Sequence, residues 1–314
     1  MILVCLLWSG LLWLPGMAQD RFSGQVLEVV SLRDSMYQQV VTDPVMYYER
    51  WDTLAQPRFW RRVMNLTPDS AVLNIAATRA VLEVFPTVQY DTLTGEAKRA
   101  WKKAKCQLYG LPLHTRLYVT YGKADYYQIR AVMPSIGQAI EIFHRVGTDP
   151  WYAQAILLIE SPGQIRRSHT GAYGSFQLMR SVAQEEGLVV TRAVDEREDF
   201  DKSAAAAARF LRRVCIPEAR RIAQRHGLPH DEQDLWFRLL VLHCYHAGAG
   251  NVAGAVRVIN PDHGGVGLIT ALWRTEVGGF RNASQNYSQV ALASLLELDA
   301  IVSRECEVLC RTEE

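Results

Sequence analysis

The sequence predicts a mainly α-helical fold, and three segments carry that prediction. Residues 148–161, "TDPWYAQAILLIES", are apolar on nearly all sides, which is typical of a helix at the centre of a core. Residues 201–214 and 231–248, "DKSAAAAARFLRRV" and "DEQDLWFRLLVLHCYHAG", have the composition and apolar spacing of two further helices. The tail from Ser288 to Leu309 has the spacing of an amphipathic helix.

The helix over 148–161 is well delimited at its start. The preceding run "IGQAIEIFHRVG" ends on Gly147, a residue that commonly terminates helices. Thr148 or Asp149 then provides a capping side chain, and Pro150 suits the first helical position. These residues belong to a predicted domain over 131–314.

The region before it, 19–130, is expected to be a mostly helical extension of unknown role. The run "SAVLNIAATRAVLEVF", residues 70–85, looks helical. A small β-hairpin is expected in residues 116–130, "RLYVTYGKADYYQIR", where alternating apolar positions flank the turn residues 122–125.

Residues 1–18, "MILVCLLWSGLLWLPGMA", contain no charged side chain and are expected to form a signal peptide. Small residues precede the expected cut, although a basic start is missing. A membrane anchor is the alternative, but the segment is short for the roughly 20 residues of a span. The protein is therefore expected to be exported, to the periplasm or cell envelope.

The composition indicates which partners to expect and whether the cysteines form disulfides. The 314 residues carry a net charge of +1, so no nucleic-acid partner is expected. An odd number of cysteines follows the signal segment, so buried free thiols are expected for most of Cys106, Cys215, Cys244, Cys306 and Cys310. His243 and His246 flank Cys244, but no further pair follows at a metal-binding spacing. Neither a metal nor a cofactor is expected.

Glu160 is the candidate catalytic residue. It ends the apolar helix, where desolvation and the negative end of the helix dipole both raise a carboxyl pKa. A raised pKa suits a general acid near neutral pH. The alternative is a glutamate that simply reaches solvent where its helix ends.

Two glycine-containing blocks follow Glu160. "SHTGAYGSFQLM", residues 168–179, contains two glycines that allow a close approach of backbone to a ligand. "CYHAGAGNV", residues 244–252, places Tyr245 and His246 at a helix end. Each block alone is equally typical of an ordinary turn or helix stop.

Together and in this order, the three pieces resemble the soluble-type lytic transglycosylases, which have a goose-lysozyme-like fold. The resemblance covers about residues 135–300. The matching residues are Glu160-Ser161, then Ser168, Gly171, Ala172, Gly174, Gln177 and Met179, then Tyr245, Ala247, Gly248, Gly250 and Val252. The chain departs from the family pattern at Pro162, Arg180 and His246, which stand where Gly, Pro and Asn are usual. Tyr287 best matches the family's tyrosine beside the acid.

The resemblance implies a mechanism and a set of site residues. Glu160 would first protonate the β-1,4 bond between N-acetylmuramic acid and N-acetylglucosamine and then act as base, closing a 1,6-anhydro ring. The partners implied are peptidoglycan glycan strands, with an envelope protein complex left open. The residues expected to bind the glycan are Ser161, Gly174, Gln177, Met179, Tyr245, His246 and Tyr287.

Two other functions remain open at this point. A lysozyme-like hydrolase would need a second carboxylate, for which Asp195, Glu196 and Asp199 are candidates. The other alternative is a catalytically weak envelope scaffold that binds peptidoglycan without cutting it. The run Asp195–Arg197 is otherwise expected to be a solvated or salt-bridged turn.

Overall fold

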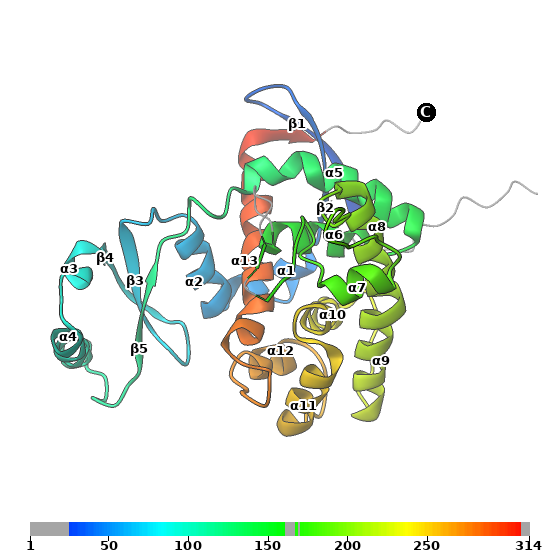
Figure 1. Ribbon diagram of the computed structural model, residues 1–314. Coiled ribbons are helices and arrows are strands. Elements are labelled where there is room, and N and C mark those ends of the chain that lie inside the picture. Colours follow the sequence, from blue (N-terminus) through cyan, green and yellow to red (C-terminus); the bar gives the residue numbers. More distant parts are fainter. Residues whose placement is uncertain (1–24, 161–166, 169, 309–314) are drawn as a thin grey trace, which may run out of the picture.

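The computed structural model describes residues 25–160, 167–168 and 170–308. Helices form the body of the molecule (Figure 1), which confirms the mainly α-helical prediction. At its centre α6 (Pro150–Glu160) packs against α5 (Ile129–Val146) and α13 (Asn282–Glu305). Every residue from Pro150 to Ile159 is buried, as the apolar run predicts.

The start of α6 is fixed by side chains from elsewhere in the fold. Asp149 caps the helix, since its carboxylate accepts a hydrogen bond from the Trp151 N–H at 2.9 Å. The same carboxylate pairs with the buried Arg238 at 2.6 Å. Gln154 bonds both the N–H and the C=O of Val41, at 2.8 and 2.7 Å, which ties α6 to strand β2. These contacts fix the position of α6 and therefore that of Glu160 at its end.

The remaining helices of the body surround this centre. α8 (Phe200–Phe210), the π-helical segment η2 (Leu211–Cys215) and α9 (Ile216–Arg225) follow one another without a break. Asp199 caps α8 by accepting a hydrogen bond from the Lys202 N–H at 3.0 Å. α10 (Leu235–Ala247) is buried over nearly its whole length. The others are α7 (Arg180–Glu185), α11 (Ala249–Ile259) and α12 (Val266–Leu272).

The last helix differs from the predicted amphipathic tail. It begins at Asn282 and ends at Glu305, and the next residues form strand β6 (Cys306–Val308). All positions from Tyr287 to Leu298 are buried, so α13 is a central helix with no continuous solvent face in that part. The prediction of an amphipathic helix from Ser288 to Leu309 is therefore wrong, because the helix begins earlier, is buried on all sides from Tyr287 to Leu298, and gives way to β6 after Glu305.

A three-stranded antiparallel sheet covers one end of the body. Its strand order is β2-β1-β6, with β1 (Gln25–Ser31) between β2 (Tyr37–Thr42) and the C-terminal β6. The short helices α1 (Val45–Tyr48) and η1 (Trp51–Thr53) follow β2 and lead into α2 (Ala55–Met64). The two ends of the described chain thus share one sheet.

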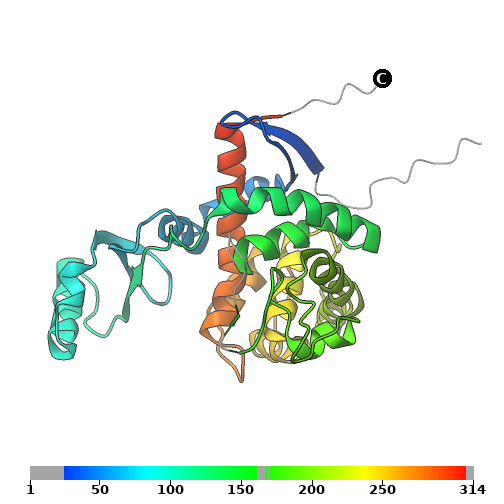
Figure 2. The same ribbon diagram turned by 45° about the horizontal axis from the view of Figure 1, so that its top comes forward.

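A second sheet belongs to a unit that projects from the body, as Figures 1 and 2 show. Its strand order is β4-β3-β5, formed by β4 (Val81–Pro86), β3 (Ser70–Ile75) and β5 (Leu117–Tyr121). Helices α3 (Val88–Asp91) and α4 (Gly95–Leu108) complete the unit. It has a small core of its own, made of Ala71, Leu73, Phe85, Cys106 and Leu117.

This unit corrects two local predictions and makes the extension less helical than expected. Residues 70–85 form the strands β3 and β4, joined by a turn, and not a helix. Residues 116–130 contain one strand, β5, whose partner is β3 and not the following segment. A Cβ on Gly122 would lie 2.2 Å from the Thr67 carbonyl oxygen, so the chain there returns to the end of α2 instead of folding back. A small hairpin exists, but β3 and β4 form it.

The described cysteines are free thiols, as expected: Cys106, Cys215 and Cys244 are buried and Cys306 is partly exposed. Cys310 and the predicted signal peptide, residues 1–18, lie outside the described residues. Within the described ranges, no helix combines the length and the apolar character of a membrane span.

Candidate active site

Glu160 is the last residue of α6 and the first in that helix with a partly exposed side chain. Desolvation raises the pKa of its carboxyl group to about 7, while hydrogen bonding to Tyr287 acts in the opposite direction. Desolvation by an apolar helix is the effect that the sequence predicts. Near neutral pH such a group holds its proton in part of the population and releases it readily, as an acid–base catalyst requires.

Three tyrosines from separate elements surround this carboxyl group. They are Tyr127, just before α5, Tyr245 near the end of α10 and Tyr287 in α13. Burial raises the pKa of each phenol, and the charge of Glu160 raises it further. All three phenols therefore stay protonated, so these described neighbours of Glu160 are neutral hydroxyl groups.

Tyr287 is the tyrosine that interacts most directly with the acid. Its hydroxyl is buried and forms no hydrogen bond of ordinary geometry with the described groups, yet it lowers the pKa of Glu160. A small adjustment of either side chain would bring the two groups into such a bond. The structure thus places Tyr287 beside the acid, where the family resemblance expects a tyrosine.

The ring of His246 stacks on the ring of Tyr287, with centroids 4.3 Å apart and planes 16° apart. His246 keeps much of its surface exposed, but the protein packed around it lowers its pKa to about 4 by desolvation. The imidazole is therefore neutral at pH 7 and able both to donate and to accept a hydrogen bond.

His243 has a different environment and role. It is fully buried, and burial lowers its pKa to about 3. The indole N–H of Trp273 donates to the Ser288 hydroxyl at 2.7 Å, and that hydroxyl lies 2.8 Å from Nε2 of His243. This chain fastens α10 to α13. It thereby fixes the positions of Tyr245 and Tyr287, which lie on those two helices.

The first glycine block forms a tight turn that is attached to α10. The Tyr245 hydroxyl donates to the Phe176 carbonyl at 2.6 Å, which joins α10 to the turn. Gly174 has a φ of +82°, and a Cβ there would lie 1.9 Å from the Arg197 carbonyl oxygen. Only glycine fits, because the backbones meet. Gln177, at a φ of +47°, bonds its side-chain amide to the Gly174 carbonyl at 2.9 Å.

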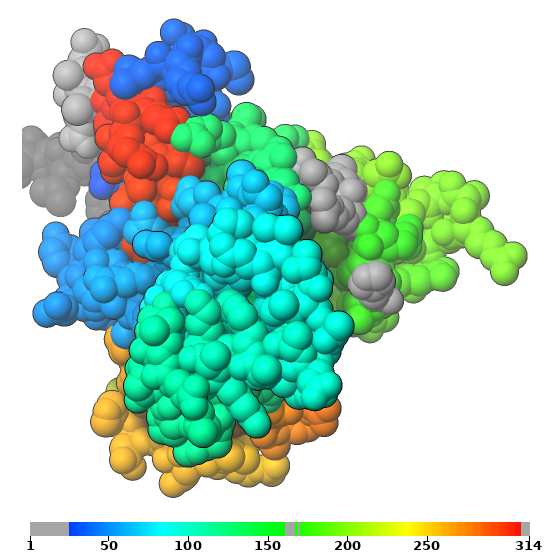
Figure 3. Space-filling model, turned by 90° about the vertical axis from the view of Figure 1, so that its left-hand side faces the viewer, coloured from blue at the N-terminus to red at the C-terminus, as the bar shows by residue number. Residues whose placement is uncertain are grey.

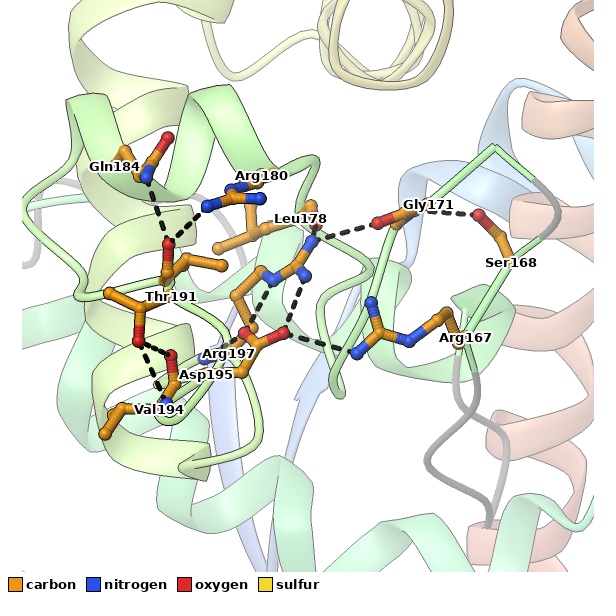
Figure 4. A network of polar contacts seen from close by, with 12 residues as sticks. Arg167, Ser168, Gly171, Leu178, Arg180, Gln184, Thr191, Val194, Asp195 and Arg197 are labelled. Atoms are coloured by element: carbon orange, nitrogen blue, oxygen red, sulfur yellow. Dashed lines mark hydrogen bonds and ion pairs between the residues drawn. The ribbon is translucent and has the colours of Figure 1, made fainter.

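The Arg197 side chain stabilises this turn through hydrogen bonds and an ion pair (Figure 4). Its side chain is 2% exposed and bonds both oxygens of Asp195, at 2.8 and 2.7 Å. Its remaining terminal nitrogen donates to the carbonyls of Gly171 and Leu178, each at 2.9 Å. Arg167 also reaches Asp195, at 3.3 Å. Asp195–Arg197 is therefore a salt-bridged turn, which was one of the two states expected for it.

The three candidates for a second carboxylate all have structural contacts. Hydrogen bonds from Arg197 keep the pKa of Asp195 below its usual range. Glu196 pairs with Lys202 at 2.6 Å and accepts the Val189 N–H at 2.7 Å. Asp199 caps α8. In the described part of the chain, none of these three is held as a free base next to a buried acid.

The predicted site residues fall into three groups. Tyr245 and Tyr287 lie near Glu160 and His246 stacks on Tyr287, whereas Gly174 and Gln177 shape the turn that Tyr245 contacts. Met179 is 43% exposed and precedes α7. Ser161 lies outside the described residues. Sequence reasoning missed Tyr127, because it belongs to the segment before the recognisable blocks and no spacing links it to Glu160.

No curated protein and no solved structure matches the chain. A family model does match: residues 139–258 correspond to the one described as "Transglycosylase SLT domain". The matched span includes Glu160, the glycine turn and the end of α10, whereas Tyr287 lies beyond it. Residues 139–258 therefore carry a transglycosylase SLT domain, and this match supports the resemblance to the lytic transglycosylases for that part of the chain.

Proposed function

We propose that the protein cleaves the β-1,4 bond between N-acetylmuramic acid and N-acetylglucosamine and leaves a 1,6-anhydromuramic end. The SLT domain over residues 139–258 supports a lytic transglycosylase-like activity on peptidoglycan in general. The observation that carries the finer proposal is a single desolvated carboxyl group with a pKa of about 7, surrounded by neutral hydroxyl groups. One group that can give and then take a proton is what ring closure without water needs.

The reaction then proceeds in two proton transfers. Protonated Glu160 donates to the glycosidic oxygen while the bond from that oxygen to muramic C1 breaks, and N-acetylglucosamine leaves with the new hydroxyl. The Glu160 carboxylate then removes the proton of the muramic C6 hydroxyl, whose oxygen bonds to C1. Glu160 is protonated again at the end, and no water is consumed.

The other site residues are proposed to hold the glycan. The exposed imidazole of His246 and the ring of Tyr245 offer a hydrogen-bonding group and a flat face to a sugar. Gln177, Gly174, Met179 and Ser161 are proposed to contact it along the glycine turn. The Tyr287 hydroxyl is proposed to stabilise the charged form of Glu160 between the two transfers.

Digestion of purified peptidoglycan tests this proposal directly. The products are separated and weighed by mass spectrometry, because anhydro and reducing ends differ by the mass of one water molecule. Anhydro-muropeptides are expected. Reducing muropeptides would make the protein a hydrolase, and intact strands bound to the protein would make it a scaffold.

The hydrolase alternative is the weaker one on structural grounds. An inverting or retaining hydrolase of the usual kind uses two carboxyl groups that face each other across the bond. Asp195 and Glu196 each form an ion pair, and Asp199 caps α8. The scaffold alternative gives no reason for a carboxyl group whose pKa is raised by desolvation.

Export to the periplasm or cell envelope is proposed with this function, because the family acts on peptidoglycan outside the cytoplasm. The apolar, uncharged residues 1–18 are the proposed signal. Detection of a mature chain that begins after Ala18, by N-terminal peptide mass, would support it.

The pH dependence of cleavage should follow the pKa of Glu160. The first transfer needs the protonated form, so kcat/KM should fall as pH rises above about 7. His246 is already neutral there, and the three phenols remain protonated, so none of these neighbours titrates in this range. Measuring kcat/KM between pH 5 and 9 determines this fall, the alkaline limb of the pH profile. A constant rate up to pH 9 would contradict the assignment of the acid.

Replacing Tyr287 by Phe should move that limb to higher pH. Hydrogen bonding from Tyr287 lowers the pKa of Glu160, so removing the hydroxyl should raise that pKa. Because no hydrogen bond of ordinary geometry joins the two groups, we expect a shift below about one pH unit. Tyr109→Phe is a matched control, since that hydroxyl bonds Glu83 in the projecting unit. A limb that moves to lower pH in Tyr287→Phe would contradict the expected sign.

A further inference from the structure

A hollow of about 540 Å³ lies between the projecting unit and the start of α13. One side comes from the turn between β3 and β4 and from the chain leading into β5, and the other from residues between Trp273 and Gln289. Figure 3 shows the projecting unit from outside, with the segments of α12 and early α13 beside it. Volumes of this size are typical of ligand sites.

Arg79 lines the hollow and has no acidic partner. Only 9% of the residue is exposed. The guanidinium lies near the rings of three aromatic residues and donates to the Asn286 side-chain oxygen at 3.1 Å. Among the described residues it forms no ion pair. A buried cation without a counter-charge is unfavourable, and a bound anion would compensate it.

Two further arginines face the same hollow. Arg116 and Arg274 are exposed, and neither forms an ion pair with any residue that the structure describes. Glu276 also lines the hollow, but its side chain is 67% exposed and lies 3.9 Å from Arg281. The first turns of α13 line it as well, and a helix N-terminus favours negative charge. The charged side chains that line the hollow are therefore mainly positive, which favours an anion.

The hollow and the candidate active site share neighbouring residues of α13. Asn286 accepts a hydrogen bond from Arg79, and the next residue in the helix, Tyr287, acts on the pKa of Glu160. A glycan strand that is bound at Glu160 and runs along this part of α13 would reach the hollow. In peptidoglycan, the groups attached to such a strand are short peptide stems that carry several carboxylates.

We propose that the hollow binds the carboxylate groups of these peptide stems, with Arg79, Arg116 and Arg274 as the ligating cations. The proposal rests on the proposed function, since it takes the glycan at Glu160 as given. It assigns the projecting unit the role of recognising strands that carry peptides. Arg79, anchored among aromatic rings, would bind at a fixed place, and the two exposed arginines would adjust to the stem.

The test compares two substrates in cleavage assays with the full mature chain. One is peptidoglycan with its stems intact, and the other is the same glycan after an amidase has removed the stems. In Arg116→Gln/Arg274→Gln the ratio of kcat/KM for intact over stripped strands should fall about tenfold, as expected for two partly exposed ion pairs. The same ratio should fall for the wild type as salt is raised.

The controls distinguish an effect of the arginine charges in the hollow from a general effect of losing an arginine and from a failure of catalysis. Arg257→Gln, on the exposed side of α11 and without a recorded ion pair, should keep the wild-type ratio. Stems whose carboxylates have been converted to amides should behave like stripped strands. A double variant with the wild-type ratio would overturn the inference, and so would amidated stems cleaved like intact ones. If the wild type cleaves neither substrate, the proposed function itself fails.

Discussion

Glu160→Gln is expected to lose at least a hundredfold to ten-thousandfold in kcat while keeping its fold. Glutamine has nearly the shape of glutamic acid, but it can neither give the proton to the glycosidic oxygen nor take one from the C6 hydroxyl. Loss of one acid–base group costs roughly this factor, and here both transfers depend on the same group. Release of anhydro-muropeptides over time measures it. Wild-type turnover in the variant would exclude Glu160 as the acid.

The same variant should be more stable than the wild type above neutral pH. The folded pKa of about 7 exceeds the ordinary value of 4.5, so the folded state binds the proton more tightly than the unfolded chain. The stability that this proton provides is full below pH 4.5 and is lost as pH rises through 7. At about 1.4 kcal/mol per pKa unit, the loss is at most about 3 kcal/mol. Glutamine carries no charge, so the variant does not lose this stability as the pH rises.

Thermal melts of both proteins from pH 5 to 9 check this linkage. The difference in Tm should grow up to about pH 7 and then level off. A variant that is less stable than the wild type at pH 8 would show that the Glu160 carboxylate is well solvated or paired. Such melts also establish that any loss of activity in Glu160→Gln is not a loss of folding.

The acid and its helix were predictable because local pattern and burial coincide there. The run from Pro150 to Ile159 is apolar on every side, so it had to be buried, and the residue that ends it had to be desolvated. The capping by Asp149 also follows from local chemistry. Neither inference requires knowledge of which distant elements cover the helix.

The projecting unit was not predictable by the same means. The run over 70–85 contains good helix formers such as Ala71 and Leu73 together with β-branched residues such as Val72 and Val84, and its apolar positions fit both periods. The first part of this run forms strand β3 because it pairs with β5, some forty residues later in the chain. Long-range pairing of this kind leaves no local signal.

The surroundings of Glu160 illustrate the same limit. Tyr287 was found by resemblance, but Tyr127 reaches the acid only because α5 begins beside it in space. The absence of an acidic partner of Arg79 among the described residues is also a property of the folded chain, since its contacts are two asparagines and aromatic rings from α2 and β5.

The largest loss of stability is expected for Arg197→Met. The substitution removes both hydrogen bonds to Asp195 and those to the Gly171 and Leu178 carbonyls, in a place that is almost closed to solvent. Breaking a buried ion pair by removing one partner costs roughly 3–5 kcal/mol. For a protein of this size, the expected fall in Tm is about 5–15 °C.

The effect should reach activity as well as stability, because the turn that Arg197 holds supplies the Phe176 carbonyl to which Tyr245 is bonded. Even below its melting temperature, the variant should therefore cleave more slowly. Arg192→Met, an exposed arginine in the same loop, is the matched control and should change Tm by no more than a degree or two. Adding Asp195→Leu to Arg197→Met should recover part of the lost stability, since it removes the carboxylate left without its main partner. An Arg197→Met protein that melts like the control would mean that the glycine turn is held by its own hydrogen bonds and that the buried guanidinium is dispensable.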